Sequence, residues 1–544
     1  MKAKAKQAVK ELLSLRILKE TLSVYLFLIL VIYPLYYVNG YVGIGKAKWH
    51  FFRVVTYYID SKPFAIPTFL VLLIIAFIWY QIDLIRTKQL SSFWKTNVTA
   101  TDWFVLAYLV FVLISTVLSP YKDFIIWGYQ GWYMGIIAQF AFCALYFFVS
   151  RFWRWDTLML MLYLGTSTIV NLLGVLNRFQ IDPLGMYKDM PFDVVFEYLS
   201  TLGQRTWYSS YVMIVFPIGL FIYWEAEKRW IRIASLIYIV IGFMTAITQD
   251  SDSAFFALFA TLLTLFSFSF DSNRHMKRFL EIIVIMLLSW RVIGFLQTAF
   301  PENAVELGEF MMFGSKSPIM WIPTVFFILL YLLFFKLDKD GRIVISAFKP
   351  LRNVILVLTI IALSGAVVYI ILNTLGKLPE NLRSDNNYLY FEDGWGNNRG
   401  LVWKTTADAL KQTALHDQIR FIFGCGPDAF YNTLYKYHAD ELNARYGSTI
   451  FICAHNEWLN SIVNIGITGG IAYIGIFVSS FVLLAKKVSK IPELAGPAMC
   501  IAAYFAHNFF CYQQIICTPI IFIIIGVGIS IFRTGGLRAI YEDN

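Results

Sequence analysis

Long runs of apolar residues, separated by short polar segments, dominate the pattern of this chain. A helix needs roughly 20 apolar residues to cross a bilayer, and fourteen runs approach that length. They cover residues 22–39, 64–83, 102–118, 133–149, 157–175, 208–224, 231–248, 253–270, 279–297, 319–336, 353–373, 458–485, 497–511 and 517–533. Because the runs are continuous and do not alternate, they indicate helices rather than strands. The pattern predicts an all-α polytopic membrane protein with about 14 transmembrane helices, of which the last two are the shortest.

One polar insertion, residues 374–455, is much longer than the other breaks between apolar runs. Within it, residues 399–415 and 427–443 carry apolar side chains at helical spacing, and the turn from Gly424 to Asp428 separates them. We therefore expect short amphipathic helices that form a lid over the membrane. The predicted organisation is an N-terminal bundle of about 11 helices over residues 1–373, the lid over 374–455, and about three helices over 456–544.

Composition and charge agree with this class and predict its orientation. The chain of 544 residues is 58% hydrophobic and 15% charged, with a net charge of +10. Basic residues are retained on the cytoplasmic side of membrane spans. Six of them precede the first run, namely Lys2, Lys4, Lys6, Lys10, Arg16 and Lys19, and Arg533 and Arg538 follow the last. Both termini and every second loop are thus predicted to be cytoplasmic, with the lid outside. The first run is expected to remain uncleaved.

One loop departs from this charge rule. Residues 40–63 should lie outside, yet they contain Lys46, Lys48, Arg53 and Lys62. Elsewhere the positive charge follows the orientation, so it gives no reason to expect nucleic acid as a partner.

Three side chains at the predicted outer face carry the most informative chemistry. His455 ends the insertion directly before a hydrophobic helix, where an imidazole is able to exchange protons with a substrate in water. Arg205 and Arg399 are expected at the same face, and guanidinium groups bind phosphate oxygens in a bidentate manner. Two other readings remain open, since interfacial arginines commonly contact lipid headgroups and a histidine before a helix is commonly a capping residue.

Further polar residues are ambiguous. Asp250 and Asp252 precede or begin a span, where we favour a helix N-cap over a second acidic site. His507 lies with Asn508 in the penultimate run, where a polar pair either packs inside the bundle or lines a cavity. The six cysteines show no metal-ligand spacing, although a Cys425–Cys453 bridge across the lid is conceivable.

The order of several short motifs resembles the O-antigen ligase and O-antigen polymerase superfamily. The similarity is concentrated in roughly 395–475. It consists of Arg399 with Trp403, the turn Gly424-Cys425-Gly426, the segment His455-Asn456-Glu457-Trp458-Leu459, and Gly466, Gly469 and Gly470. Outside this region it is supported by Leu202-Gly203-Gln204-Arg205, His507-Asn508 and Pro519.

The resemblance implies a glycosyltransferase that needs no metal or other cofactor and works at the outer face of a bacterial cytoplasmic membrane. Its implied partners are an undecaprenyl-pyrophosphate-linked glycan donor, a glycan or lipid acceptor, and membrane lipids. Arg205 and Arg399 would hold the pyrophosphate, and His455 would act as base or orient the acceptor. The expected substrate-binding residues are Asn456, Trp403, Gln204, Asp250, Asp252 and His507.

The chain departs from the family pattern at one point and leaves two functional alternatives open. Where the family commonly has Ser-Arg, Asp250-Ser251-Asp252-Ser253 replaces a cation with carboxylates, which affects the expected acceptor. The motifs do not separate a ligase from a polymerase, although we favour a polymerase slightly. A transporter of lipid-linked oligosaccharide is the alternative of another class. It is less favoured because the candidate charges gather at one face and no repeated halves are evident.

Overall fold

The computed structural model describes residues 12–61, 64–96, 98–129, 131–188, 190–191 and 194–537. Four of the basic residues used to predict the orientation before the first run, Lys2 to Lys10, lie outside this range, as do Lys62 and Arg538.

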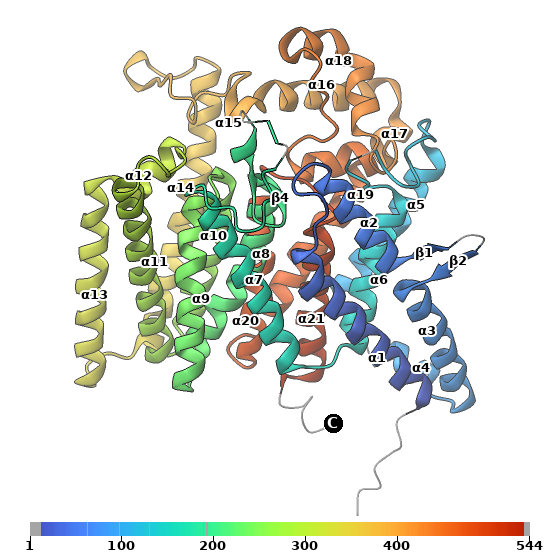
Figure 1. Cartoon of the computed structure of the whole chain (residues 1–544), viewed down its shortest axis with the longest axis horizontal. Helices are drawn as coiled ribbons and strands as arrows, with labels where there is room; N and C mark the ends of the chain where they lie inside the picture. Colours follow the sequence, from blue (N-terminus) through green and yellow to red (C-terminus); the bar gives the residue numbers. More distant parts are fainter. Residues whose placement is uncertain are drawn as a thin grey trace, which may run out of the picture.

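The described chain is a helical bundle with two short antiparallel hairpins, β1–β2 (Tyr58–Ser61, Phe64–Pro67) and β3–β4 (Tyr198–Leu199, Gly203–Gln204) (Figure 1). The helices before the lid are α1 Leu13–Phe27, α2 Ile44–Thr56, α3 Phe69–Arg86, α4 Leu90–Thr96, α5 Ala100–Leu118, α6 Ile136–Phe152, α7 Thr157–Asn177, α8 Arg205–Glu225, α9 Arg229–Thr248, α10 Asp252–Ser269, α11 Asn273–Ala299, α12 Glu309–Lys316, α13 Trp321–Lys339 and α14 Lys349–Thr374. The lid contains α15 Trp395–Asn398, α16 Gly400–His416, α17 Gln418–Phe423 and α18 Phe430–Tyr446, and α19 Glu457–Ala485, α20 Ala495–His507 and α21 Thr518–Thr534 follow it.

Every predicted apolar run contains a helix, but the number of spans differs from fourteen. Ten helices in the described residues are long and apolar enough to cross a membrane. The helices α6 and α21 are apolar but shorter, and α20 has only 13 residues. The predicted membrane class is confirmed, whereas the count of fourteen is not.

The regular helix of the first apolar run ends before the run does. The helix α1 stops at Phe27, and a wider turn over Leu28–Ile32 and a tighter turn over Tyr33–Leu35 follow it. In these irregular turns, the buried Nζ of Lys48 donates to the carbonyl oxygens of Tyr33 (2.8 Å) and Pro34 (3.1 Å). Arg53 in the same loop pairs with Asp60 at 2.6 Å. Two of the four basic residues that disagree with the charge rule therefore have structural partners.

The bundle has a central and a peripheral part. In α8, 72% of the most apolar stretch is buried, and α8 packs against α9 and α20. In α14, Asn373 is the one buried residue. The helices α13 and α14 thus present apolar surface nearly all round, which is stable only in lipid.

The lid lies at one end of the bundle, at the top of Figure 1, and α1 begins at the opposite end. The lid helices share a small core that includes Val402, Phe430 and Leu434 and extends to Val463 of α19. The predicted pair of amphipathic helices corresponds to α16 and α18, with the short α17 between them. Asp428 fastens the lid turn to the loop before α6, because one of its carboxylate oxygens accepts the backbone N–H of Tyr129 (2.6 Å) and of Met134 (3.2 Å).

Close backbone contact joins the lid to α19 at two glycines. Gly466 has a φ of +75° and interrupts α19, which frees carbonyl groups of the preceding turn. The N–H of Gly426 donates to the carbonyl of Asn464 at 2.8 Å. A Cβ on Gly424 would lie 2.3 Å from that same oxygen, and a Cβ on Gly466 would lie 2.2 Å from the carbonyl oxygen of Ile422. Only glycine fits at both positions.

Candidate active site

The starts of three bundle helices gather beneath the lid. The helix α8 begins at Arg205, α10 at Asp252, and α19 directly after His455 and Asn456. The irregular segment 508–517 between α20 and α21 lies among them, as its hydrogen bonds to Gln204 and Trp207 show. The N-termini of helices carry partial positive charge and unpaired N–H groups, so this arrangement favours a bound anion.

Arg399 is the cation at this place that has no partner. It lies at the N-terminus of α16, and among the described residues its guanidinium makes no hydrogen bond or ion pair. Burial lowers the pKa of Arg399, whereas Cys511, Tyr512, Cys453 and Asp252 act in the opposite direction. An arginine stays charged even so. A partly buried guanidinium without a counter-ion is poised to bind an anionic ligand.

His455 is the second residue with a polar atom that has no partner among the described residues. Its backbone has a φ of +48°, an unusual value for a residue other than glycine, and its Nδ1 is buried without a hydrogen bond. The ring packs edge-on against Tyr512, with 5.1 Å between centroids. Burial, and next the charge of Arg399, lower the pKa of His455 from 6.5 to about 3. The imidazole is therefore neutral at ordinary pH and able to accept a proton.

Tyr512 connects His455 to the start of α8. Its hydroxyl donates to Oε1 of Gln204 at 3.2 Å and accepts from Nε1 of Trp207 at 3.0 Å. Trp132 packs against the same ring, at 4.3 Å between centroids. Gln204 is thus placed beside the histidine through Tyr512, a residue that the sequence reading did not single out.

Arg205 differs from Arg399 because its charge is already paired. Its Nε contacts Glu197 at 2.8 Å and its Nη1 contacts Asp250 at 3.0 Å. The Asp250 carboxylate also accepts the N–H of Gly308 at 2.7 Å. The favoured reading of Asp250 and Asp252 as an N-cap is wrong: Ser251 occupies the cap position of α10, with no capping side-chain bond. The carboxylate of Asp250 instead forms an ion pair with Arg205.

Asp252 joins the two arginines electrostatically. Both Arg399 and Arg205 act on its carboxylate, and the lid residue Tyr388 donates to it at 3.4 Å. Of the predicted acidic pair, Asp250 therefore forms an ion pair with Arg205, and Asp252 accepts a hydrogen bond from the lid.

Two predicted binding residues have structural partners of their own. Asn456 is the N-cap of α19 and accepts the N–H of Leu459 at 3.0 Å. Trp403 donates from Nε1 to the carbonyl of Ala454 at 2.9 Å and stacks on Phe510 at 5.9 Å. These two hydrogen bonds fix the backbone on either side of His455.

His507 lies below this surface in a buried polar network. Its ring nitrogens contact Ser209, Ser210 and Ser253 at 3.2–3.4 Å. The Oδ1 atom of Asn508 accepts from Nδ1 of His507, and its Nδ2 donates to the buried carboxylate of Glu457. The hydroxyl of Tyr504 donates to the same carboxylate at 2.9 Å. Of the two readings for this pair, packing inside the bundle is the one observed.

The cysteines of the site are thiols. Cys425 and Cys453 are buried and free, so the conceivable bridge between them is not formed. Burial raises the pKa of both thiols, which makes them poor nucleophiles. Within the part of the chain that the structure describes, no three His, Cys, Asp or Glu side chains are grouped to hold a metal ion.

Comparison with known proteins agrees with the class that fold and site define, a multi-pass helical membrane protein with a polar centre under a lid. Residues 304–474 match the family model described as O-antigen ligase. No curated protein matches the chain in a sequence comparison. The resemblance to the O-antigen ligase superfamily is therefore confirmed, and it holds for the segment that carries Arg399, Trp403, His455 and Asn456. Because that family consists of glycan ligases and polymerases, the match supports an enzyme.

Sequence reasoning missed the groups that connect the predicted residues. Arg178 is buried and donates to the carbonyls of Thr248 (2.6 Å) and Phe196 (2.9 Å), which holds the turn of Asp250 against the segment of Glu197. Glu457 belongs to the segment that carries the family resemblance but was given no role, and Tyr512 was not named at all. Gln513 and Gln514 beside Tyr512 do interrupt an apolar block, and this break is what could have indicated a buried loop.

Proposed function

We propose that this protein transfers a glycan from an undecaprenyl-pyrophosphate carrier to an acceptor hydroxyl at the outer face of the cytoplasmic membrane. The acceptor is a second carrier-linked glycan or a lipid, and polymerisation is slightly favoured over ligation. The observation that carries the proposal is that Arg399, a guanidinium without a partner among the described residues, acts by its charge on a neutral imidazole, His455, beside a set of helix N-termini. This combination suits an anionic leaving group and an attacking hydroxyl.

The donor's pyrophosphate binds Arg399 first in this proposal. Arg205 joins the clamp by exchanging Glu197 or Asp250 for phosphate oxygens, because two carboxylates already occupy its guanidinium. The prenyl tail lies in the bilayer, and the glycan extends under the lid, residues 374–455. Tyr512 lies between His455 and Arg205, because its ring packs against His455 and its hydroxyl donates to Gln204, the residue before Arg205.

In the transfer step, the acceptor oxygen attacks the anomeric carbon as the bond from that carbon to the pyrophosphate breaks. His455 accepts the acceptor's proton, and the cations stabilise the charge that develops on the leaving undecaprenyl pyrophosphate. Attack opposite the leaving group inverts the anomeric configuration. A product with retained configuration would contradict this geometry.

The proposed base changes its proton affinity during the cycle. Arg399 is one of the two causes of the low pKa of His455. A pyrophosphate bound at Arg399 neutralises that charge and adds negative charge nearby, which favours the imidazolium. His455 is thereby a stronger base when the donor is bound than when the site is empty.

The test is complementation of a deletion strain with wild-type, His455→Ala and His416→Ala proteins at matched membrane levels. His416 is an exposed lid histidine at the end of α16 and serves as the matched control. Carrier-linked intermediates and surface glycan are separated by size. Single carrier-linked repeats in His455→Ala identify a polymerase, and long carrier-linked glycan without transfer identifies a ligase. If His455→Ala resembles wild type in both pools, the proposal is wrong and transport of the glycan becomes the better reading.

A further inference from the structure

An apolar groove is formed by α10, α19 and α20 and opens toward the lipid. It has a volume of about 300 Å³, and every residue that lines it is apolar. Val478 of its wall is 47% exposed, so the groove is open on the side of the membrane. The lining combines three alanines with larger side chains and includes Ala260, Ala502, Ala506, Phe477, Val478 and Phe505.

The groove begins directly below the candidate active site. Ala506 precedes His507, the last residue of α20, and α20 ends beside the site. Phe505 packs against Trp458 at 4.4 Å between ring centroids, and Phe477 packs against the same indole at 5.4 Å. Because Trp458 lies three residues after His455, one end of the groove lies beneath the start of α19.

Aromatic rings extend from Arg399 toward this groove. The N–H of Arg399 donates to the carbonyl of Trp395, and the N–H of Trp403 donates to that of Arg399, each at 2.9 Å. The rings of Trp395 and Trp403 contact Phe510, at 6.0 and 5.9 Å between centroids. The charge of Arg399 interacts with Cys511, the residue after Phe510. The unpaired guanidinium and an aromatic surface therefore lie side by side.

Phe510 continues this surface to the wall of the groove. Its ring lies 4.8 Å from that of Phe256 in α10, between centroids. Phe256 is 49% exposed and precedes Ala260 by four residues, which places both on one face of α10. A continuous apolar path thus connects the cation under the lid with the lipid-facing groove.

The groove suits a short stretch of a branched hydrocarbon chain. Its lining on α20 extends from Ile501 to Ala506, about 8 Å at 1.5 Å per residue. The alanines of α10 and α20 leave space that larger side chains would fill. Because a hydrocarbon chain gains little when it leaves lipid for an apolar protein surface, a charged head must supply most of the affinity of an occupant. The nearest such contact is Arg399.

From these features we propose that the groove holds the isoprene units of the glycan donor that lie nearest its pyrophosphate. This assignment rests on the proposed function, which places the pyrophosphate at Arg399. The tail crosses Phe510 and Phe256, its first units lie in the groove over the alanines, and the remainder stays in the bilayer.

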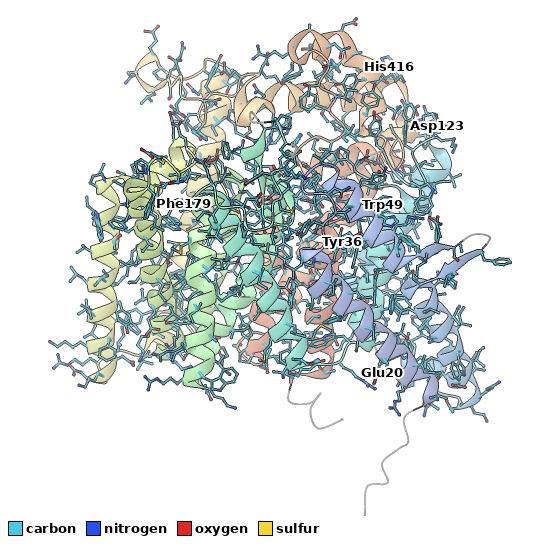
Figure 2. The ribbon with its side chains drawn as sticks, viewed as in Figure 1. Glu20, Tyr36, Trp49, Asp123, Phe179 and His416 are labelled. Atoms are coloured by element: carbon cyan, nitrogen blue, oxygen red, sulfur yellow. The ribbon has the colours of Figure 1, made fainter. Side chains whose placement is uncertain are left out.

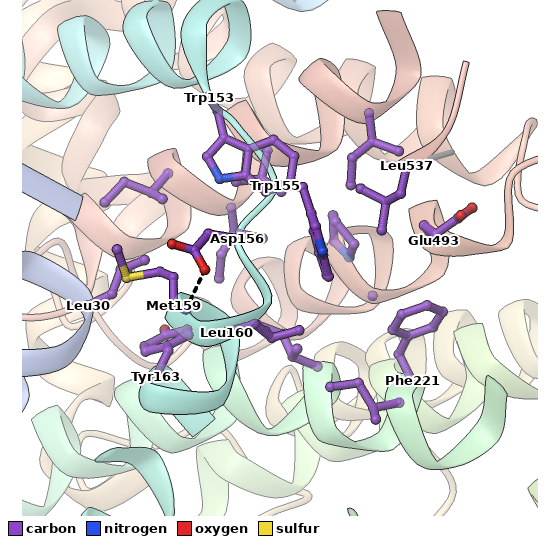
Figure 3. A pocket seen from close by; sticks show the side chains of 18 residues that line it. Leu30, Trp153, Trp155, Asp156, Met159, Leu160, Tyr163, Phe221, Glu493 and Leu537 are labelled. Atoms are coloured by element: carbon purple, nitrogen blue, oxygen red, sulfur yellow. Dashed lines mark hydrogen bonds between the residues drawn. The ribbon is translucent and has the colours of Figure 1, made fainter. Parts of the chain in front are cut away.

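The pocket shown in Figure 3 is the alternative place for such a tail. It is lined by residues of α1, α7, α8, α20 and α21 and has a volume of about 140 Å³, less than half that of the groove. Glu493 of its lining precedes α20, whose other end reaches the candidate site. The length of α20 therefore separates this pocket from Arg399, and the carboxylates of Asp156 and Glu493 in its lining disfavour a pyrophosphate there.

Photo-crosslinking of the full-length protein in nanodiscs tests the assignment. The probe is undecaprenyl pyrophosphate with a diazirine on the second isoprene unit from the pyrophosphate, and mass spectrometry identifies the labelled peptides. We expect the labels to concentrate on α20 near Ala502 and Ala506 and on α10 near Ala260. Labels spread over the lipid-exposed helices α13 and α14, or concentrated in the pocket of Figure 3, would overturn the assignment.

The head of the probe separates this inference from the proposed chemistry. Arg399→Ala, or an excess of inorganic pyrophosphate, should lower labelling of the groove about tenfold, the size of one hydrogen bond to a charged group. His455→Ala should be labelled like wild type, because labelling reports binding and not transfer. Full labelling without Arg399 would refute the donor tail as occupant, even where His455→Ala abolishes transfer. Normal transfer in His455→Ala would instead refute the proposed base and leave the groove assigned.

Variants that fill the groove test the contact with the tail. Ala502→Leu should lower labelling about tenfold, as expected when extra side-chain atoms enter a filled space, and should leave binding of inorganic pyrophosphate unchanged. Ala260→Leu repeats the test from the opposite wall in case the first variant does not fold. The control, Ala362→Leu, places the same side chain on the exposed surface of α14 and should be labelled like wild type. Undiminished labelling in both groove variants, or an equal loss in the control, would refute the proposed tail site.

Discussion

At the level of single side chains, the two arginines of the site have different environments. Arg205 is balanced by two carboxylates, and Arg399 by none among the described residues. In Arg399→Lys the point charge remains but the planar fork is lost. We expect kcat/KM for the donor to fall about 10- to 100-fold, the effect of roughly 1.5–3 kcal/mol for hydrogen bonds to a charged group. Steady-state kinetics measures this, and unchanged kcat/KM would remove Arg399 from the clamp.

A matched substitution at Arg205 tests the importance of its pairing. Arg205→Lys keeps a cation near Glu197 and Asp250, so we expect a smaller loss than in Arg399→Lys in the same donor titration. A larger loss at Arg205 than at Arg399 would mean that Arg205, and not Arg399, is the principal phosphate ligand.

The protonation of His455 gives a pH prediction. Its pKa in the free enzyme is about 3, below the ordinary 6.5, so the neutral base persists until the solution becomes strongly acidic. Since kcat/KM reports the free enzyme and kcat the bound complex, kcat/KM should show no fall attributable to His455 down to about pH 5. The fall in kcat should lie at higher pH, because the bound pyrophosphate raises the pKa. An acid limb near 6.5 in kcat/KM would contradict the buried, cation-adjacent histidine.

Among the elements, the lid turn and the broken α19 meet through close backbone contact at Gly424 and Gly466. A side chain at Gly466 would meet the carbonyl of Ile422 and would require an unfavourable backbone angle. We expect Gly466→Ala to separate the lid turn from α19, at a cost of order 1–3 kcal/mol, and to speed proteolysis between α17 and α18. Limited proteolysis of the purified protein measures this.

The control for this variant is Gly365→Ala in α14. That glycine has open space around its Cα and lies in a lipid-facing helix, where alanine is the better helix former. Its digestion pattern should match wild type. If Gly466→Ala also matches wild type, the lid is held mainly by its own small core and by Asp428.

For the molecule as a whole, the positions of two exposed residues test the orientation. His416 lies at the lid end and Glu20 near the opposite end (Figure 2). Each cysteine among the described residues is buried, so the background for a membrane-impermeant maleimide is low. We expect His416→Cys to react in intact cells and Glu20→Cys to react only after permeabilisation. The reverse pattern would invert the predicted topology and with it the outer location of the site.

The membrane class, the positions of the helices, the amphipathic lid and the matched family segment follow from local features of the sequence. Apolar runs and helical spacing act over neighbouring residues, so their consequences are readable along the chain. The count of fourteen spans did not follow from these local features, because α1 ends in irregular turns that bind Lys48 and because α20 has only 13 residues.

The state of each functional group, in contrast, depends on contacts between residues far apart in sequence. Arg205 meets Asp250 and Glu197, His455 meets Tyr512, and His507 is enclosed by serines of α8 and α10. No local pattern encodes these pairings. Burial and nearby charge set whether a guanidinium is paired and whether an imidazole is neutral, and both are properties of the packed bundle, so they became visible only in three dimensions.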